Sequence, residues 1–110
     1  MIAEKALKEI PFTTGFMVVD LENLEVLEKS GEAEKIEEPV KNLIRDYMET
    51  YINLGELDIG LPTEMLLTFD AVFVLMRFFP EINRVFVAVT QKEANLGFVR
   101  MMMIRYSEEV

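Results

Sequence analysis

The sequence predicts a single α+β domain over residues 1–110, with a small, mainly antiparallel sheet packed against three or more helices. Three observations lead to this expectation. The chain has 110 residues, which is the size of one ordinary domain. Residues 39–53 show the 3.6-residue apolar rhythm of an amphipathic helix. Residues 84–90 (RVFVAVT) are rich in the β-branched and aromatic side chains that favour strands.

The N-terminal part is predicted to contain a short helix and a strand. Apolar residues of segment 2–10 fall on one helical face, and Pro11 ends the pattern. Gly15–Val19 has strand composition. Segment 20–29 leaves two alternatives open: Asp20 can cap a helix, or residues 24–28 can form a further strand after a turn. We favour the helix.

An acidic connector, Ser30–Glu38, is predicted to precede the amphipathic helix Pro39–Asn53, because proline suits the first position of a helix. Acidic residues ahead of a helix N-terminus are electrostatically favourable. We therefore interpret the acidic run as a solvated connector, with docking of a basic protein partner as the alternative.

Thr63–Phe79 is predicted to be the central helix of the domain, because Pro62 and Pro80 bracket it and 12 of its 17 residues are apolar. Its polar residues Thr63, Asp70 and Arg77 recur every seven positions, which places them on one narrow stripe. Asp70 and Arg77 are candidates for a polar seam, although simple exposure to solvent also explains them.

The C-terminal part is predicted to be a β-hairpin. Arg84–Thr90 and Phe98–Tyr106 are two apolar runs joined by a short segment, Gln91–Gly97, and sequence neighbours of this kind pair antiparallel. Both faces of this hairpin are apolar. The second face must therefore be covered by helices or by another subunit.

The composition excludes several kinds of chemistry. Without cysteine or histidine, the chain can form no disulfide, thiolate zinc site or histidine-based triad. It carries no phosphate-binding, dinucleotide-binding or nucleophile-elbow motif, and the carboxylates Glu56, Asp58 and Glu64 do not follow a calcium-loop spacing. A net charge of −9 disfavours nucleic acid and anionic membranes. We expect no cofactor, no metal and a non-enzymatic role.

The expected location is the cytoplasm, because residues 1–10 (MIAEKALKEI) contain no apolar targeting segment. The chain has a single glutamine, Gln91, and no cysteine or tryptophan, a composition that would suit a thermophile.

The leading functional hypothesis is a protein-interaction domain that forms a homodimer. Hydrophobic residues make up 51% of the chain, including eight phenylalanines and eight methionines, and a small domain has limited room to bury them. Methionine adapts to varied partner surfaces. The candidate interface residues are Met101, Met102, Met103, Phe86, Phe98 and Tyr106.

Three alternatives are weighed beside it. A small-molecule binding domain would have an apolar cavity between the central helix and the sheet, lined by Phe69, Phe73, Phe86 and Met102. A carboxylate-dependent enzyme would need an acid with a strongly shifted pKa in a cleft. A winged-helix-like DNA binder has the same element order, but the apolar segment 63–79 lacks side chains that read bases.

Overall fold

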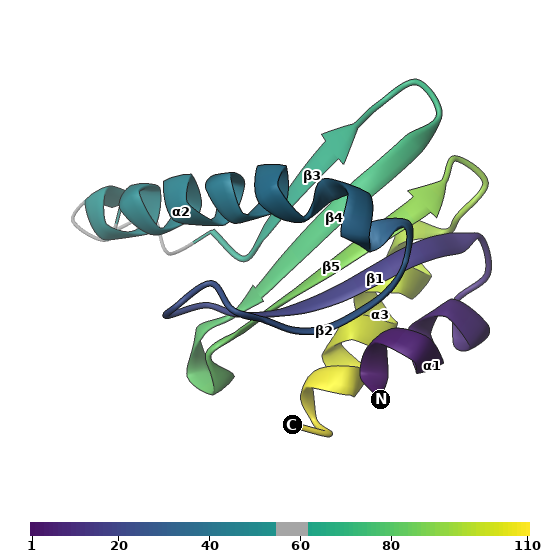
Figure 1. Ribbon diagram of the computed structural model, residues 1–110, viewed down its shortest axis with the longest axis horizontal. Coiled ribbons are helices and arrows are strands. Elements are labelled where there is room, and N and C mark those ends of the chain that lie inside the picture. Colours follow the sequence, from purple (N-terminus) through teal and green to yellow (C-terminus); the bar gives the residue numbers. More distant parts are fainter. Residues whose placement is uncertain (55–61) are drawn as a thin grey trace.

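The computed structural model describes the backbone of residues 1–54 and 62–110, and the side chains of residues 1–50 and 62–110. Five strands form one antiparallel sheet in the order β2-β1-β5-β4-β3 (Figure 1). The strands are β1 Thr13–Asp20, β2 Val26–Gly31, β3 Glu64–Thr68, β4 Val72–Phe79 and β5 Arg84–Gln91. The helices are α1 Ile2–Glu9, α2 Glu37–Leu54 and α3 Leu96–Ser107, with the short 3-10 helices η1 Glu32–Ile36 and η3 Pro80–Ile82.

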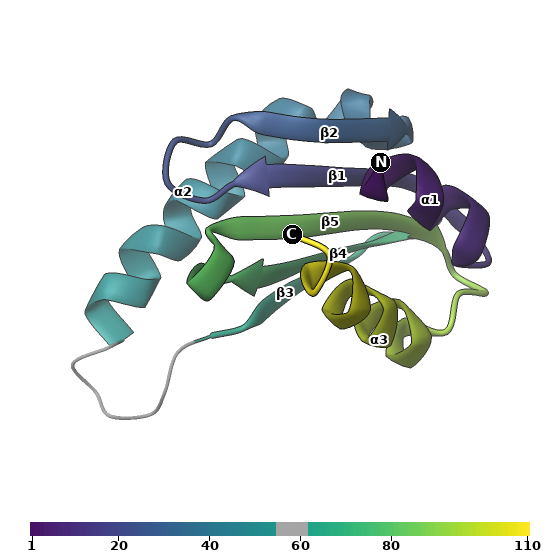
Figure 2. The same cartoon turned by 90° about the horizontal axis from the view of Figure 1, so that it is seen from below.

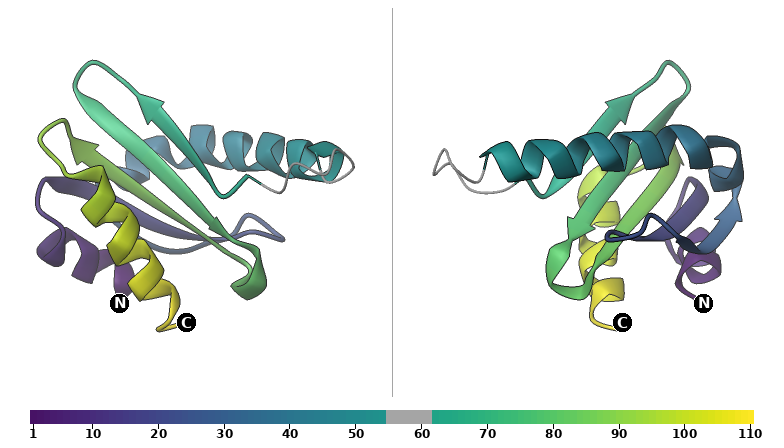
Figure 3. Two further views of the ribbon diagram at one scale, coloured as in Figure 1. Left: turned by 180° about the vertical axis from the view of Figure 1, so that it is seen from behind. Right: turned by 60° about the vertical axis from the view of Figure 1, so that its left-hand side comes forward.

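The sheet is the middle layer of three. Helices α1 and α3 lie side by side on one face, and α2 crosses the other face diagonally (Figures 2 and 3). One apolar core therefore lies between the sheet and α1/α3, around Phe16, Phe86 and Tyr106. A second core lies between the sheet and α2, where Met76 and Ile44 are fully buried. Strands buried on both faces explain why the sequence is so rich in apolar residues.

The predicted central helix is wrong: residues 63–79 form β3, a turn at residues 69–71, and β4. The error has a physical cause. A half-buried strand alternates polar and apolar residues, but β4 is covered by helices on both faces and reads as a continuous apolar run, VFVLMRFF. Asp70, which we placed on a helical stripe, lies in the exposed turn. The polar residue marked the break between two strands.

The predicted C-terminal hairpin is also wrong, because residues 96–107 form the helix α3. Asn95 caps it: its Oδ1 accepts a hydrogen bond from the Phe98 N–H at 3.1 Å. The buried residues Val99, Met102, Met103 and Tyr106 follow the spacing i, i+3, i+4, i+7 of one helical face. We missed that rhythm because the exposed Met101 and Ile104 interrupt it with further apolar residues.

Segment 20–29 is the turn and start of a strand, so the favoured helix is wrong there. The Asp20 carboxylate accepts the backbone N–H groups of Glu22 and Asn23, which closes a tight turn after β1. These bonds lower the pKa of Asp20, with the Asn23 N–H as the largest cause.

The other predicted elements match the structure with small differences in their ends, namely helices 2–10 and 39–53 and strands 15–19 and 84–90.

A pair of buried hydroxyl groups lies at one end of the sheet. Thr13 pairs with Thr90 between β1 and β5, and within the described residues neither Oγ1 atom has a hydrogen-bond partner. A buried polar group without a partner destabilises the folded state. We expect Thr90→Val, which keeps the β-branched shape, to raise the free energy of unfolding by about 1 kcal/mol. Urea denaturation measures this, and a lower midpoint would show that the hydroxyl is satisfied in solution.

Candidate interaction surface

Within the described residues, the sheet ends at β2 on one side and at β3 on the other. The hydrogen bonds flanking β3 show which backbone groups face outward. The Phe78 N–H donates to the Thr63 carbonyl and the Phe69 N–H donates to the Val72 carbonyl, both at 2.9 Å. Because the pattern alternates along an antiparallel strand, Glu64, Leu66 and Thr68 direct their N–H and C=O groups to the open side. The β3 edge is therefore ready to pair with another strand.

Apolar side chains border the β3 edge on both faces of the sheet. Leu66 lies on the α1/α3 face with 37% of its surface exposed. Met65 and Leu67 lie on the α2 face, half-buried against the second core. Helix α2 crosses this face, and its C-terminal turns project past β3 (Figures 1 and 2). The edge strand thus combines outward backbone groups with an apolar surface on either side.

The opposite edge carries charge. Lys29, in the middle of β2, forms ion pairs with Glu37 at 3.3 Å and Glu34 at 3.7 Å. Charged residues on an edge strand discourage pairing with another chain. The comparison of the two edges favours β3 as the surface for association.

Glu64 joins β3 to two other elements. Its carboxylate accepts hydrogen bonds from Arg77 in β4 at 3.0 Å and from Arg100 in α3 at 2.8–3.0 Å. The bond from Arg100 is the largest cause that lowers the pKa of Glu64 below its ordinary value of 4.5. The ion cluster therefore fixes the first residue of the edge strand against α3.

Glu64→Gln is expected to lower the free energy of unfolding by about 1 kcal/mol at neutral pH, since the cluster is partly exposed and screened by water. A lowered pKa in the folded state gives stability that is present above pH 4.5 and is lost as the pH falls through the folded-state pKa. The wild type should therefore lose more stability below pH 4.5 than the variant. Urea unfolding across this range tests it, with Glu49→Gln on the exposed face of α2 as control. Parallel acid profiles for wild type and variant would contradict the role of the cluster.

A shallow apolar groove continues from the end of β3 on the α2 face. It has a volume of about 250 Å³ and lies between η1 and the β3–β4 turn, where Ile36, Phe69 and Val72 line it. Phe69 leaves 52% of its surface in water. An aromatic side chain this exposed beside an apolar groove extends the candidate surface beyond the strand itself.

Several solved structures share this architecture. A Roadblock/LC7 domain from Streptomyces avermitilis matches with a TM-score of 0.80 at 13% identity, covering 99% of this chain and 91% of that one. The chain has a Roadblock/LC7-like fold. Myxococcus xanthus MglB matches with a TM-score of 0.80 at 14% identity, covering 98% of this chain and 87% of that one. A structure described as MglB with tetrameric arrangement matches with a TM-score of 0.74 at 15% identity, covering 98% of this chain and 81% of that one. No family model and no curated protein matches the sequence.

In this Roadblock/LC7-like fold, most of the predicted interface residues lie in the interior. Phe86, Met102, Met103 and Tyr106 belong to the core under α1 and α3, so they are not available to a partner. The Tyr106 hydroxyl donates to Glu9 at 2.8 Å, and burial raises the pKa of Tyr106. Met101 is exposed and Phe98 is half-buried. A helix, unlike the expected strand, directs Met102 and Met103 inward together.

The other sequence-predicted sites are separated by the Roadblock/LC7-like fold. Asp70 lies in the β3–β4 turn while Arg77 bonds Glu64, so the two form no seam. The residues that were expected to line one apolar cavity do not come together. Phe69 lies on the α2 face of the sheet, and Phe86 lies on the opposite face. Glu56 and Asp58 fall outside the described residues. Among the described ones, no group of three or more metal-ligating side chains comes together.

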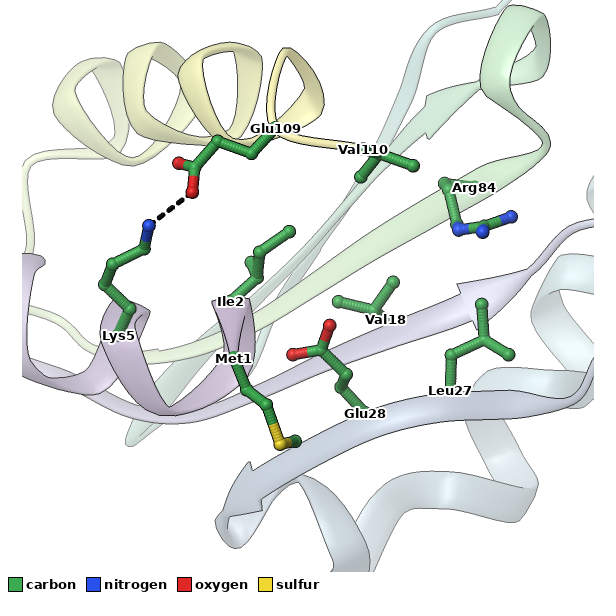
Figure 4. A pocket seen from close by; sticks show the side chains of 9 residues that line it. All are labelled: Met1, Ile2, Lys5, Val18, Leu27, Glu28, Arg84, Glu109 and Val110. Atoms are coloured by element: carbon green, nitrogen blue, oxygen red, sulfur yellow. Dashed lines mark hydrogen bonds and ion pairs between the residues drawn. The ribbon is translucent and has the colours of Figure 1, made fainter.

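A larger hollow, of about 500 Å³, lies between α1, α3 and the β2–β1–β5 side of the sheet (Figure 4). Its lining mixes apolar Val18 and Leu27 with charged Glu28 and Arg84. Glu28 accepts the Ala3 N–H at 3.0 Å, which uses one carboxylate oxygen to cap the start of α1. A hollow with this much charge does not suit an apolar ligand.

The acidic run is partly neutralised by the fold. Gly31, with a φ of 64°, turns the chain from β2 into η1, where an added Cβ would come within 2.2 Å of the Thr14 carbonyl oxygen. Glu37 pairs with Lys29 and with Lys41 at the first turn of α2.

Within residues 1–54 and 62–110, no helix combines the length and the apolar character that crossing a membrane requires.

Proposed function

We propose that this chain is a self-associating protein-interaction domain, and that its β3 edge is the surface through which two copies pair. The observation that carries the proposal is the β3 edge itself, where Leu66 presents an exposed side chain together with outward N–H and C=O groups. The opposite edge, by contrast, holds the ion pairs of Lys29.

A two-fold axis through Leu66 supports a self-complementary contact. Antiparallel pairing about this axis places Leu66 opposite its counterpart and Glu64 opposite Thr68 of the second copy. Each such pair exchanges two backbone hydrogen bonds, which joins two five-stranded sheets into one. Met65 and Leu67 then meet the partner on the α2 face. The contact combines backbone bonding with apolar burial.

The structural neighbours support self-association in general terms. One of them is described as MglB with tetrameric arrangement, which is a statement about that protein. A shared fold makes self-association reasonable for this chain, although function follows from the site and not from the fold. The site on the β3 edge supplies the specific argument.

Salt separates this apolar contact from an electrostatic one. The net charge of −9 per chain repels a second copy, so added salt should leave association unchanged or strengthen it. Light scattering at tens of micromolar protein, in about 0.05 M and about 0.5 M salt, measures this. We expect a mass of twice 12.7 kDa in both conditions. A monomer in both conditions would reject the proposal, and dissociation at high salt would reject the apolar contact.

A basic protein partner is a second use of the same domain. The outer face of α2 exposes Glu38, Asp46 and Glu49, of which Glu38 pairs with Lys41 at 3.8 Å, and Arg45 is exposed beside them. Such a face would attract a positively charged surface, and added salt would weaken this binding because it screens the charges. The two contacts therefore respond to salt in opposite directions.

A further inference from the structure

Phe12 combines two features that ordinary packing does not explain. It lies between α1 and β1 with a φ of 66°, in the left-handed region that bulky residues rarely adopt. Its side chain leaves 50% of its surface in water. Left-handed backbone at a non-glycine residue is costly and tends to persist at functional sites. An aromatic residue held this way, with only partial burial, points to a role outside the core.

The backbone around Phe12 is fixed on both sides. The Gln91 N–H donates to the Phe12 carbonyl at 2.9 Å, which ties the turn to the end of β5. The Thr13 N–H donates to the Ile10 carbonyl at 3.3 Å, which closes the turn itself. Two hydrogen bonds therefore hold the backbone at Phe12. The α1–β1 and β5–α3 connections lie side by side (Figure 2).

An apolar hollow of about 250 Å³ lies beside the ring. Ile10, Pro11, Phe12 and Phe98 form its apolar lining, and Glu93 and Asn95 complete it. The Asn95 side-chain oxygen already accepts the Phe98 N–H. The Glu93 carboxylate is exposed and supplies the charge at the rim. The hollow is large enough for one aliphatic side chain.

The charged residue that lines the hollow is Glu93. Glu9 lies at the end of α1, on the side that faces α3, where its carboxylate meets Tyr106. The neighbouring cation Lys92 is directed to the ring of Phe73, 4.3 Å from its centroid. The whole chain carries −9, which disfavours a second copy as the occupant of an acidic-rimmed site.

We propose that this hollow binds a segment of a partner protein that presents one aliphatic side chain next to a lysine or arginine. The aliphatic group fills the space between Phe12 and Phe98, and the cation meets Glu93. The inference does not depend on pairing through β3, because this surface is formed by different elements.

Nuclear magnetic resonance titration of the full chain with short peptides tests the chemistry. Acetylated and amidated Lys-Leu-Lys should shift the backbone amide signals of Phe12, Glu93 and Phe98. Glu-Leu-Glu and Lys-Ala-Lys should bind at least roughly tenfold more weakly, because each lacks one of the two recognised groups. Equal effects from the three peptides, or shifts elsewhere on the chain, would overturn the proposal.

Phe12→Gly separates binding from folding. Glycine adopts the left-handed region without strain, so the variant should keep or raise its melting temperature while binding of Lys-Leu-Lys falls at least about tenfold. Ile104→Ala is the matched control, since Ile104 is an exposed apolar residue of α3 that does not line the hollow and should leave peptide binding unchanged. A lower melting temperature for Phe12→Gly would show that the ring serves folding. A loss of self-association in the same variant would identify a second copy as the occupant, and either result overturns the proposal.

Discussion

Replacing Leu66 with lysine is expected to abolish the proposed pairing through β3 and leave a monomer. The side chain lies at the centre of the β3 edge, with outward backbone groups, and two-fold pairing would place the two lysines opposite each other. We expect the dissociation constant to rise about a hundredfold or more, which corresponds to about 2.7 kcal/mol. Light scattering over a dilution series measures the change. The melting temperature of the diluted protein should change little, because the side chain is already partly in water.

The other edge of the sheet provides a matched control. Leu27 in β2 is exposed to 38%, against 37% for Leu66, so Leu27→Lys introduces the same charge on an edge residue of equal exposure. It should leave the mass unchanged. Leu66→Pro is a second test, because its N–H points to the open side and proline removes no hydrogen bond within the sheet. If Leu27→Lys dissociates the protein and both Leu66 variants do not, association does not use β3.

Phe86→Ala is expected to have the largest effect on stability. Phe86 is fully buried in β5, with ring centroids 5.1 Å from Phe79 and 6.0 Å from Phe16. Truncating a buried phenylalanine costs about 3–5 kcal/mol, a large part of the total stability of a small domain. Urea denaturation and near-ultraviolet circular dichroism measure the loss. The effect should not depend on protein concentration, because the ring contacts its own chain.

Met101→Ala gives the contrasting result. Phe86 and Met101 were both interface candidates from the sequence, but Met101 leaves 53% of its surface in water on the outer face of α3. Its truncation should change the free energy of unfolding by no more than about 0.5 kcal/mol. Comparable stability losses for the two variants would place Met101 in a packed environment. A concentration-dependent loss for Phe86→Ala would place that ring at a contact between chains.

The candidate interaction surface could not be derived from the sequence. Leu66 is one leucine in the run EMLLTF, and its importance follows from lying at the edge of the sheet. Edge position depends on which strands pair, and that is set by contacts between residues distant in sequence. The same limit applies to Phe12, since its left-handed backbone and its hollow require the β5–α3 loop to lie beside it.

Part of the misassignment was avoidable. The spacing of Val99, Met102, Met103 and Tyr106 indicates a helical face, and Asn95 is a good N-cap residue just before it. In segment 63–79, the β-branched and aromatic run after Asp70 favours a strand. The flanking prolines and the seven-residue recurrence of polar residues favour a helix in segment 63–79, but the structure shows that both are coincidental.

Elements α1, α2, β1 and β5 could be predicted from the sequence, because each carries a periodic pattern or a composition that local conformation explains. The sequence also determined the absence of histidine and cysteine chemistry. For the apolar segment 63–79, packing between the layers settled the choice between one helix and two strands. The physical reason is burial: when helices cover both faces of a sheet, its strands lose the polar alternation that identifies them. The choice then rests on which arrangement packs both cores.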